Sequence, residues 1–235
     1  GGWRDPSDVP GLAPPAFPPL GNQPLRVVVV DRPDAVQTVV RFVMPASSYA
    51  DPNRPELFLI NTILGGSFTS RLNQNLREEH GYTYGARSRF TMNPSVGYFT
   101  ASSSVRADVT GASISEFLKE FATLRSGNVS ANEVRKAVAT RRMQMIQSFQ
   151  GLSGILGAAA TLVRNDRPFT EPGDELEAMA NVTDGDLNAL VRNAVALERG
   201  LLVLVGDKKS ILAQLEGIDL PTPIELTVTG DAAGN

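Results

Sequence analysis

The sequence predicts an α+β fold, in which a largely antiparallel β-sheet has α-helices packed on one face. Strand-like runs lie near the start, at residues 25–31 and 37–44, and again at 201–205. Between them lie an alternating hairpin at 83–105 and then about a hundred residues with mainly helical periodicity. This order of strands, helices, hairpin, helices and strand is typical of an α+β domain.

The strands are predicted from β-branched runs and from alternation. Leu25 to Asp31 is a valine-rich run that closes at Pro33, and Gln37 to Met44 alternates well enough to be its neighbour in the sheet. Thr83 to Met92 and Val96 to Val105 alternate on either side of an Asn-Pro-Ser turn, so we expect an antiparallel hairpin there. The continuous apolar run 201–205 predicts a fully buried strand.

The helices are predicted from apolar stripes and capping residues. Pro55 opens a helix that Gly65-Gly66 should stop in the conformation that only glycine adopts cheaply. A second helix is expected from about Ser70 to His80, with Gly81 as its stop. A stripe at 114–124, a capping box at 130–133 and later cap signals predict further helices, over 130–149, 151–165, 173–181, 184–197 and 210–215.

The domain organisation follows from proline and glycine content. Seven of the sixteen prolines fall within residues 6–24, so residues 1–24 are predicted to be an extended interdomain linker. Residues 25–229 are predicted to form one folded domain, and residues 230–235 a disordered tail. The linker indicates that the chain begins at a domain junction of something longer.

Composition excludes several classes of site. There is no cysteine and one histidine, His80, so a zinc site with two or three imidazole ligands cannot be built from this chain alone. The net charge of −3 argues against a nucleic-acid partner. No run of eighteen apolar residues occurs, so we expect no membrane insertion.

One pair of polar side chains could carry chemistry. Arg77 should lie in the last turn of the second predicted helix, and Tyr84 at the start of the strand that follows, so a guanidinium and a phenol could converge at the junction. Such a pair offers hydrogen-bond donors that suit a carbonyl or a developing oxyanion. In the alternative interpretation, Arg77 pairs with a surface carboxylate such as Glu78 and Tyr84 is a packing residue.

The segment 64–85 carries a motif made of Ser70-Arg71-Leu72, then Leu76-Arg77-Glu78, then Gly81 to Tyr84. With this motif the segment resembles the C-terminal half of the pitrilysin/insulinase-type zinc metallopeptidases, the inverzincins, in the subgroup similar to mitochondrial processing peptidase. The resemblance extends to the proline-rich lead, to Val30 to Pro33 and Gln37, and to Val203 to Asp207.

The resemblance implies a split active site. In that family an N-terminal half holds zinc through His-x-x-Glu-His and a distal Glu, while the C-terminal half supplies an Arg and a Tyr seven positions apart. Arg77 and Tyr84 have this spacing and would bind the peptide backbone and stabilise the tetrahedral intermediate, whereas Tyr82 is only five positions from Arg77. This chain has no His-x-x-Glu-His, and His80 is predicted to be a surface residue in the last helical turn.

The resulting expectation is a catalytically incomplete, substrate-binding half of a zinc metalloendopeptidase that is not active alone. The chain would carry no cofactor, and zinc is expected in its partner, an N-terminal half or a paired subunit. The alternative is a non-catalytic scaffold or assembly homologue of the same fold. The resemblance favours a bacterial protein of the periplasm or cytoplasm and leaves the compartment open.

Overall fold

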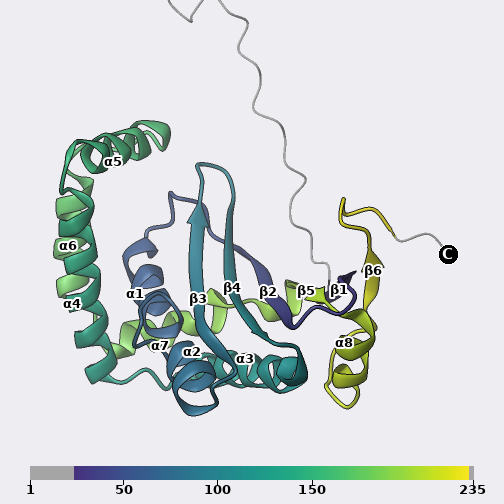
Figure 1. Cartoon of the computed structure of the whole chain (residues 1–235). Helices are drawn as coiled ribbons and strands as arrows, with labels where there is room; N and C mark the ends of the chain where they lie inside the picture. Colours follow the sequence, from purple (N-terminus) through teal and green to yellow (C-terminus); the bar gives the residue numbers. More distant parts are fainter. Residues whose placement is uncertain (1–23, 233–235) are drawn as a thin grey trace, which may run out of the picture.

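The computed structural model describes residues 24–232. The predicted linker at 1–24 lies outside this range except for its last residue. The described chain contains a six-stranded sheet with the order β3-β4-β2-β5-β1-β6 and helices packed against it (Figure 1). The strands are β1 (Arg26–Asp31), β2 (Gln37–Ala46), β3 (Thr83–Met92), β4 (Gly97–Arg106), β5 (Leu201–Gly206) and β6 (Ile224–Leu226).

The predicted fold class is confirmed, with one correction to strand order. Strands β2, β3, β4 and β5 pair antiparallel, while β1 pairs parallel with β5 and β6. The sequence analysis predicted that the two N-terminal strands are neighbours in the sheet. This prediction was wrong, because β5 lies between β1 and β2. Residues 201–205 return from the far end of the chain to fill this place, which no local pattern can indicate.

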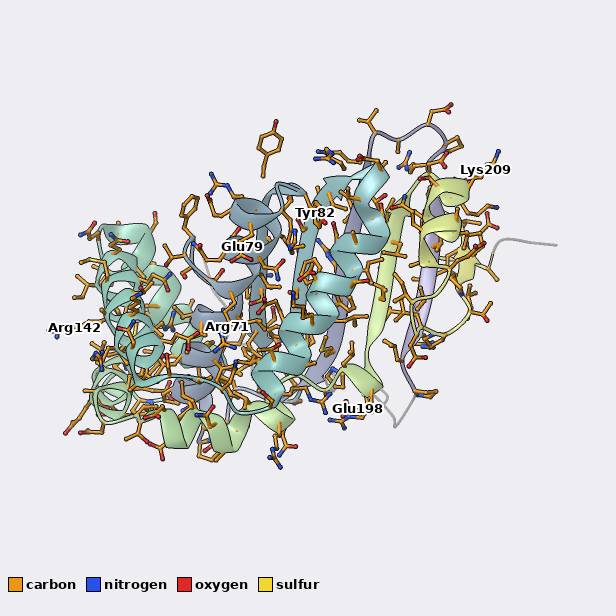
Figure 2. The ribbon with its side chains drawn as sticks, turned by 90° about the horizontal axis from the view of Figure 1, so that it is seen from below. Arg71, Glu79, Tyr82, Arg142, Glu198 and Lys209 are labelled. Atoms are coloured by element: carbon orange, nitrogen blue, oxygen red, sulfur yellow. The ribbon has the colours of Figure 1, made fainter. Side chains whose placement is uncertain are left out.

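Helices cover one face of the sheet. Helix α1 contacts β3, α3 contacts β2 and β4, and α8 contacts β1 and β5. Seen from below, α3 and α8 lie in front of the strands (Figure 2). The α-helices are α1 (Arg54–Leu64), α2 (Arg71–Asn73), α3 (Thr110–Arg125), α4 (Ala131–Ser148), α5 (Leu152–Arg164), α6 (Glu171–Ala180), α7 (Asp184–Ala194) and α8 (Lys208–Leu215).

The core lies between the sheet and these helices. Strand alternation sends every second side chain toward the helices, where Phe42 packs against Phe117 and Phe121 with ring centroids 5.4 and 5.2 Å apart. The capping boxes at Ser130 and Thr183 open α4 and α7, which confirms both predicted helix starts. Strand β5 is buried on its helix-facing side only, so the prediction of a fully buried strand was wrong.

The second predicted helix has an unexpected geometry. Only Arg71–Asn73 is α-helical, and Gln74–Glu79 forms a π-helix, whose wider turns are often found at functional sites. The backbone N–H of Tyr82 bonds to the carbonyl of Leu76, and Gly81 ends the segment with φ +64°, as predicted. The predicted second helix therefore starts as an α-helix and continues as a π-helix.

The predicted tail is described only for its first residues. The backbone N–H of Thr227 bonds to the Asp231 carbonyl, and Ala232 forms a bridge with Leu226, while disorder from Gly230 stays a prediction. Residues 233–235 lie outside the described range.

In the described part of the chain, no single helix is long and apolar enough to cross a membrane. Helices α4 and α5 together have the length and apolar composition of a membrane span, but the two helix axes are bent by 107° at the break between them. Helix α5 projects away from the sheet (Figure 1), and its Leu152 and Val163 side chains are exposed.

The sequence analysis expected the glycine pair after α1 to adopt a left-handed conformation. The structure shows that Gly65 instead allows close packing. Gly65 has φ −158°, which any residue can adopt. A Cβ atom on Gly65 would lie 2.6 Å from the backbone nitrogen of Ser88 in β3, and that nitrogen bonds to the Gly65 carbonyl. The missing side chain therefore lets the end of α1 approach the edge strand of the sheet.

We expect Gly65→Ala to lower the free energy of unfolding by about 1–3 kcal/mol, because the added methyl group overpacks this contact. The control is Gly157→Ala in α5, where a Cβ atom meets nothing within 4 Å and helix propensity should add about 0.5–1 kcal/mol of stability. Urea unfolding measures both. Equal effects of the two substitutions would contradict this account of Gly65.

Candidate functional site

The junction between the π-helix and β3 carries both predicted site residues. Arg77 lies in the last turn of the π-helix, and its carbonyl accepts a hydrogen bond from the backbone N–H of Gly81. Tyr84 lies three residues after Gly81, at the start of β3. Figure 2 labels Glu79 and Tyr82, which lie on the two sides of this junction.

Arg77 is accessible and weakly held. A third of its side chain is exposed, its guanidinium lies 4.3 Å from the ring centroid of Phe68, and its Nη1 atom is 3.5 Å from Glu78 Oε1. Exposed ion pairs of this kind contribute little, about 0.2–1 kcal/mol. Pairing with Glu78, the alternative predicted from sequence, is therefore present but leaves the guanidinium free to take a stronger partner.

Tyr84 is not a packing residue. Its side chain is 94% exposed, which contradicts the alternative interpretation that placed it in the sheet core. Tyr84 lies in a β-bulge, because the register runs from Thr83 opposite Val105 to Ala86 opposite Ser103, which leaves two residues of β3 against one of β4. Among the described residues no hydrogen bond joins Tyr84 to Arg77, so both side chains are available to a third group.

Hydrogen bonds within the sheet hold the bulge in place. Thr83 donates from Oγ1 to the Ser104 carbonyl at 2.7 Å, and Ser103 donates from Oγ to the Gly85 carbonyl at 3.0 Å. The Gly85 and Ser104 carbonyls at the bulge therefore have side-chain partners. These bonds fix the backbone on both sides of Tyr84 while its phenol stays in solvent.

A buried asparagine joins the helix to the bulge, and no sequence pattern pointed to it. Asn73 donates from Nδ2 to the Ala86 carbonyl at 2.8 Å and accepts from the Ala86 N–H through Oδ1 at 2.9 Å. Its amide thus occupies the position of a neighbouring strand at the edge of β3. The residue is buried, so Ala86 has no water to replace this partner.

Helix α3 holds the π-helix from the other side. Asn75 donates to Glu116 at 2.7 Å and to Glu120 at 2.9 Å. Burial alone raises the pKa of Glu116, but hydrogen bonds from Asn75 and Lys119 hold that pKa below its ordinary value. The carboxylate therefore stays charged at neutral pH and keeps its bond to the π-helix.

His80 and Tyr82 form a separate pair. Their rings stack with centroids 4.8 Å apart, and the His80 Nε2 atom lies 3.8 Å from Glu116 Oε1. His80 is exposed at the end of the π-helix, where the sequence placed it. Tyr82 is half-buried and lies outside the bulge that carries the exposed Tyr84.

The described residues do not fit a zinc ion. In residues 24–232, no three His, Cys, Asp or Glu side chains lie close enough together to hold a metal. What this part of the chain offers is a set of donors. Tyr84 also borders a depression of about 470 Å³ on the sheet face away from the helices, lined by Gln37, Val39, Arg41, Thr83, Tyr84, Gly85, Arg87 and Ser102 to Ser104.

Fold and site together define a class of protein domain: a sheet covered by helices on one face, with exposed hydrogen-bond donors at a helix–strand junction. The particular family follows from the sequence match. The chain belongs to the peptidase M16 inactive domain family, whose model matches residues 3–141. The assignment to that broad class is confirmed, while the subgroup similar to mitochondrial processing peptidase stays a prediction. A search of curated proteins finds no match.

Solved structures share the fold at low sequence identity. The peptidase M16 inactive domain from Pseudomonas fluorescens has a TM-score of 0.71 and 22% identity, over 79% of this chain and 44% of that one. A protease from Helicobacter pylori has a TM-score of 0.69 and 15% identity, over 77% and 44%.

A chain of complex III2 from Candida albicans, solved with Inz-5 bound, has a TM-score of 0.65 and 13% identity, over 81% and 46%. The present chain thus spans less than half the length of these structures. At such identities the likeness shows the fold alone.

We expect Asn73→Ala to lower the free energy of unfolding by about 2–4 kcal/mol, because it leaves the buried N–H and carbonyl of Ala86 without partners. Amide hydrogen exchange at Ala86 should also become faster. The control is Gln74→Ala, one residue along and exposed, which should change stability by no more than about 0.5 kcal/mol. Unchanged exchange at Ala86 would show that Asn73 does not hold the bulge.

Proposed function

We propose that this chain is the substrate-binding, catalytically incomplete half of a zinc-dependent metalloendopeptidase. In this proposal Arg77 and Tyr84 bind the peptide backbone and stabilise the tetrahedral intermediate. The observation that carries the proposal is that a chain of the M16 inactive domain family presents this Arg and this Tyr, seven positions apart, as accessible side chains at one junction.

The chemistry of the pair supports this role. A guanidinium has donors only, and a phenol can donate its O–H, so both can bond an oxygen on which negative charge develops. Neither group needs to act as nucleophile or base. Because the contacts of Arg77 with Phe68 and Glu78 are exposed, a peptide carbonyl can compete for the guanidinium at small cost.

The partner in this proposal is an N-terminal zinc-binding half or a paired subunit. That half would supply the zinc ion and the activated water, since the described part of this chain has no cluster of metal ligands. The share of the related structures that the chain spans, 44% in the first two, is compatible with such a division. The chain is then inactive on its own, and its substrate is a peptide bound between the two halves.

A second candidate is a non-catalytic scaffold or assembly homologue of the same fold. The similarity to a chain of complex III2 favours it, since that structure is named for an assembly and not for a protease. The subgroup similar to mitochondrial processing peptidase, and a bacterial periplasm or cytoplasm as compartment, belong to the proposal. A His-x-x-Glu-His motif encoded upstream of Gly1, or in a paired gene, would favour the peptidase over the scaffold.

We expect Arg77→Ala and Tyr84→Phe, each in the chain assembled with its zinc-bearing half, to lower turnover of a quenched peptide about a hundredfold to a thousandfold. Each substitution removes one donor from the developing oxyanion. Zinc content, measured by metal analysis of the assembled enzyme, should be unchanged, because neither side chain is a ligand.

The matched control is Tyr82→Phe, which removes the same hydroxyl from a half-buried tyrosine two residues away. It should leave turnover near the wild-type level. Wild-type turnover in both the Arg77 and Tyr84 variants would exclude the proposed roles and leave the scaffold as the better hypothesis.

A further inference from the structure

Two arginines and a serine form a row across three strands on the sheet face away from the helices. Ser102 in β4 lies directly opposite Arg41 of β2 on one side and Arg87 of β3 on the other. The buried neighbours Phe42, Ala86 and Ala101 alternate with them and point toward the helices, so the three row residues point the other way.

The spacing of the row suits a small anion. Adjacent strands lie about 4.8 Å apart, so the Cα atoms of Arg41 and Arg87 lie roughly 10 Å apart with Ser102 between them. The short serine side chain leaves room for the two long side chains to reach a common ligand. All three residues line the depression of about 470 Å³ that Tyr84 also lines.

These guanidiniums lack carboxylate partners. Within residues 24–232, Arg41, Arg87 and Arg89 take part in no ion pair, although the chain as a whole has a net charge of −3. Arg89 lies two positions along β3 from Arg87 and so shares its face.

The acidic residues of the strands lie on the other face. The described strands contain two carboxylates, Asp31 and Glu225. Asp31 follows the buried Val29 by two positions in β1, and Glu225 lies opposite Val29. Both bond to Lys208 at the start of α8, on the helix side. The open face is therefore basic, with no carboxylate on its strands to neutralise it.

We propose that Arg41 and Arg87 form a subsite that binds the side-chain carboxylate of an Asp or Glu residue in the peptide substrate, beside Tyr84. Two guanidiniums offer a carboxylate more charge-assisted hydrogen bonds than either offers alone. An incoming carboxylate would also relieve the repulsion between them. This inference rests on the proposed function, which makes a peptide the substrate. It adds that the peptide carries an acidic residue near the bond to be cut.

The test measures binding, so it needs neither zinc nor cleavage. The full chain, labelled with ¹⁵N, is titrated with two amidated and acetylated peptides of seven residues, each all alanine except for a central Glu or a central Gln. At low salt we expect the Glu peptide to bind about threefold to tenfold more tightly, with saturable amide shifts at Arg41, Arg87 and Ser102. Raising the salt concentration should reduce the preference.

Variants with one charge removed locate the site. Arg41→Gln and Arg87→Gln should each abolish most of the preference for Glu. The control is Arg142→Gln, which makes the same change on α4, far from Tyr82 in Figure 2. This variant should retain the preference for the Glu peptide. Equal affinity for the two peptides, absence of saturable shifts at the row, or an equal effect of Arg142→Gln would overturn the subsite.

The two proposals can fail separately. Normal turnover in the Arg77 and Tyr84 variants removes the proposed catalytic role without touching a measured preference for Glu. Conversely, equal binding of the two peptides removes the acidic subsite and leaves the turnover test of Arg77 and Tyr84 as it stands.

Discussion

The pairing of one side chain with one backbone residue decides where the candidate site can form. Asn73 bonds both the N–H and the carbonyl of Ala86, at 2.9 and 2.8 Å, and so closes the edge of β3 as another strand would. The π-helix begins at the next residue, and the bulge that carries Tyr84 ends at Ala86. The buried amide of Asn73 therefore helps to hold together the two segments that carry Arg77 and Tyr84.

The two faces of the sheet differ in the side chains that they carry. The face under the helices carries the phenylalanines and aliphatic residues that hold the domain together. The opposite face carries Arg41, Arg87 and Ser102 around a depression, and these side chains do not belong to the hydrophobic core. A summed charge of −3 conceals this separation, because the carboxylates of the strands lie with Lys208 on the helix side.

Local patterns predicted the elements well, and the contacts between them poorly. Alternation gave the β3–β4 hairpin, and Gly81 gave the end of the helical segment, since both depend on residues close in the sequence. The insertion of β5 between β1 and β2, the π-helix and the reason for Gly65 all depend on partners far along the chain. For the site, the family resemblance assigned roles to Arg77 and Tyr84, and these roles stay a prediction, while the row of Arg41, Ser102 and Arg87 can be recognised only from the strand register.

The kind of side chain at the junction is compatible with the proposed division of work between this domain and a zinc-bearing half. In the proposed function Arg77 and Tyr84 would act by donating hydrogen bonds, and a donor needs only a fixed backbone and access to solvent. The bulge and the π-helix meet the first condition, and the exposed positions of both side chains meet the second. A nucleophile or a metal would require additional ligands or a base around it. In the proposed function, a half that only binds and orients a peptide could therefore change the residues of its open face to select peptide sequences. The residues needed for bond cleavage would lie in the other half.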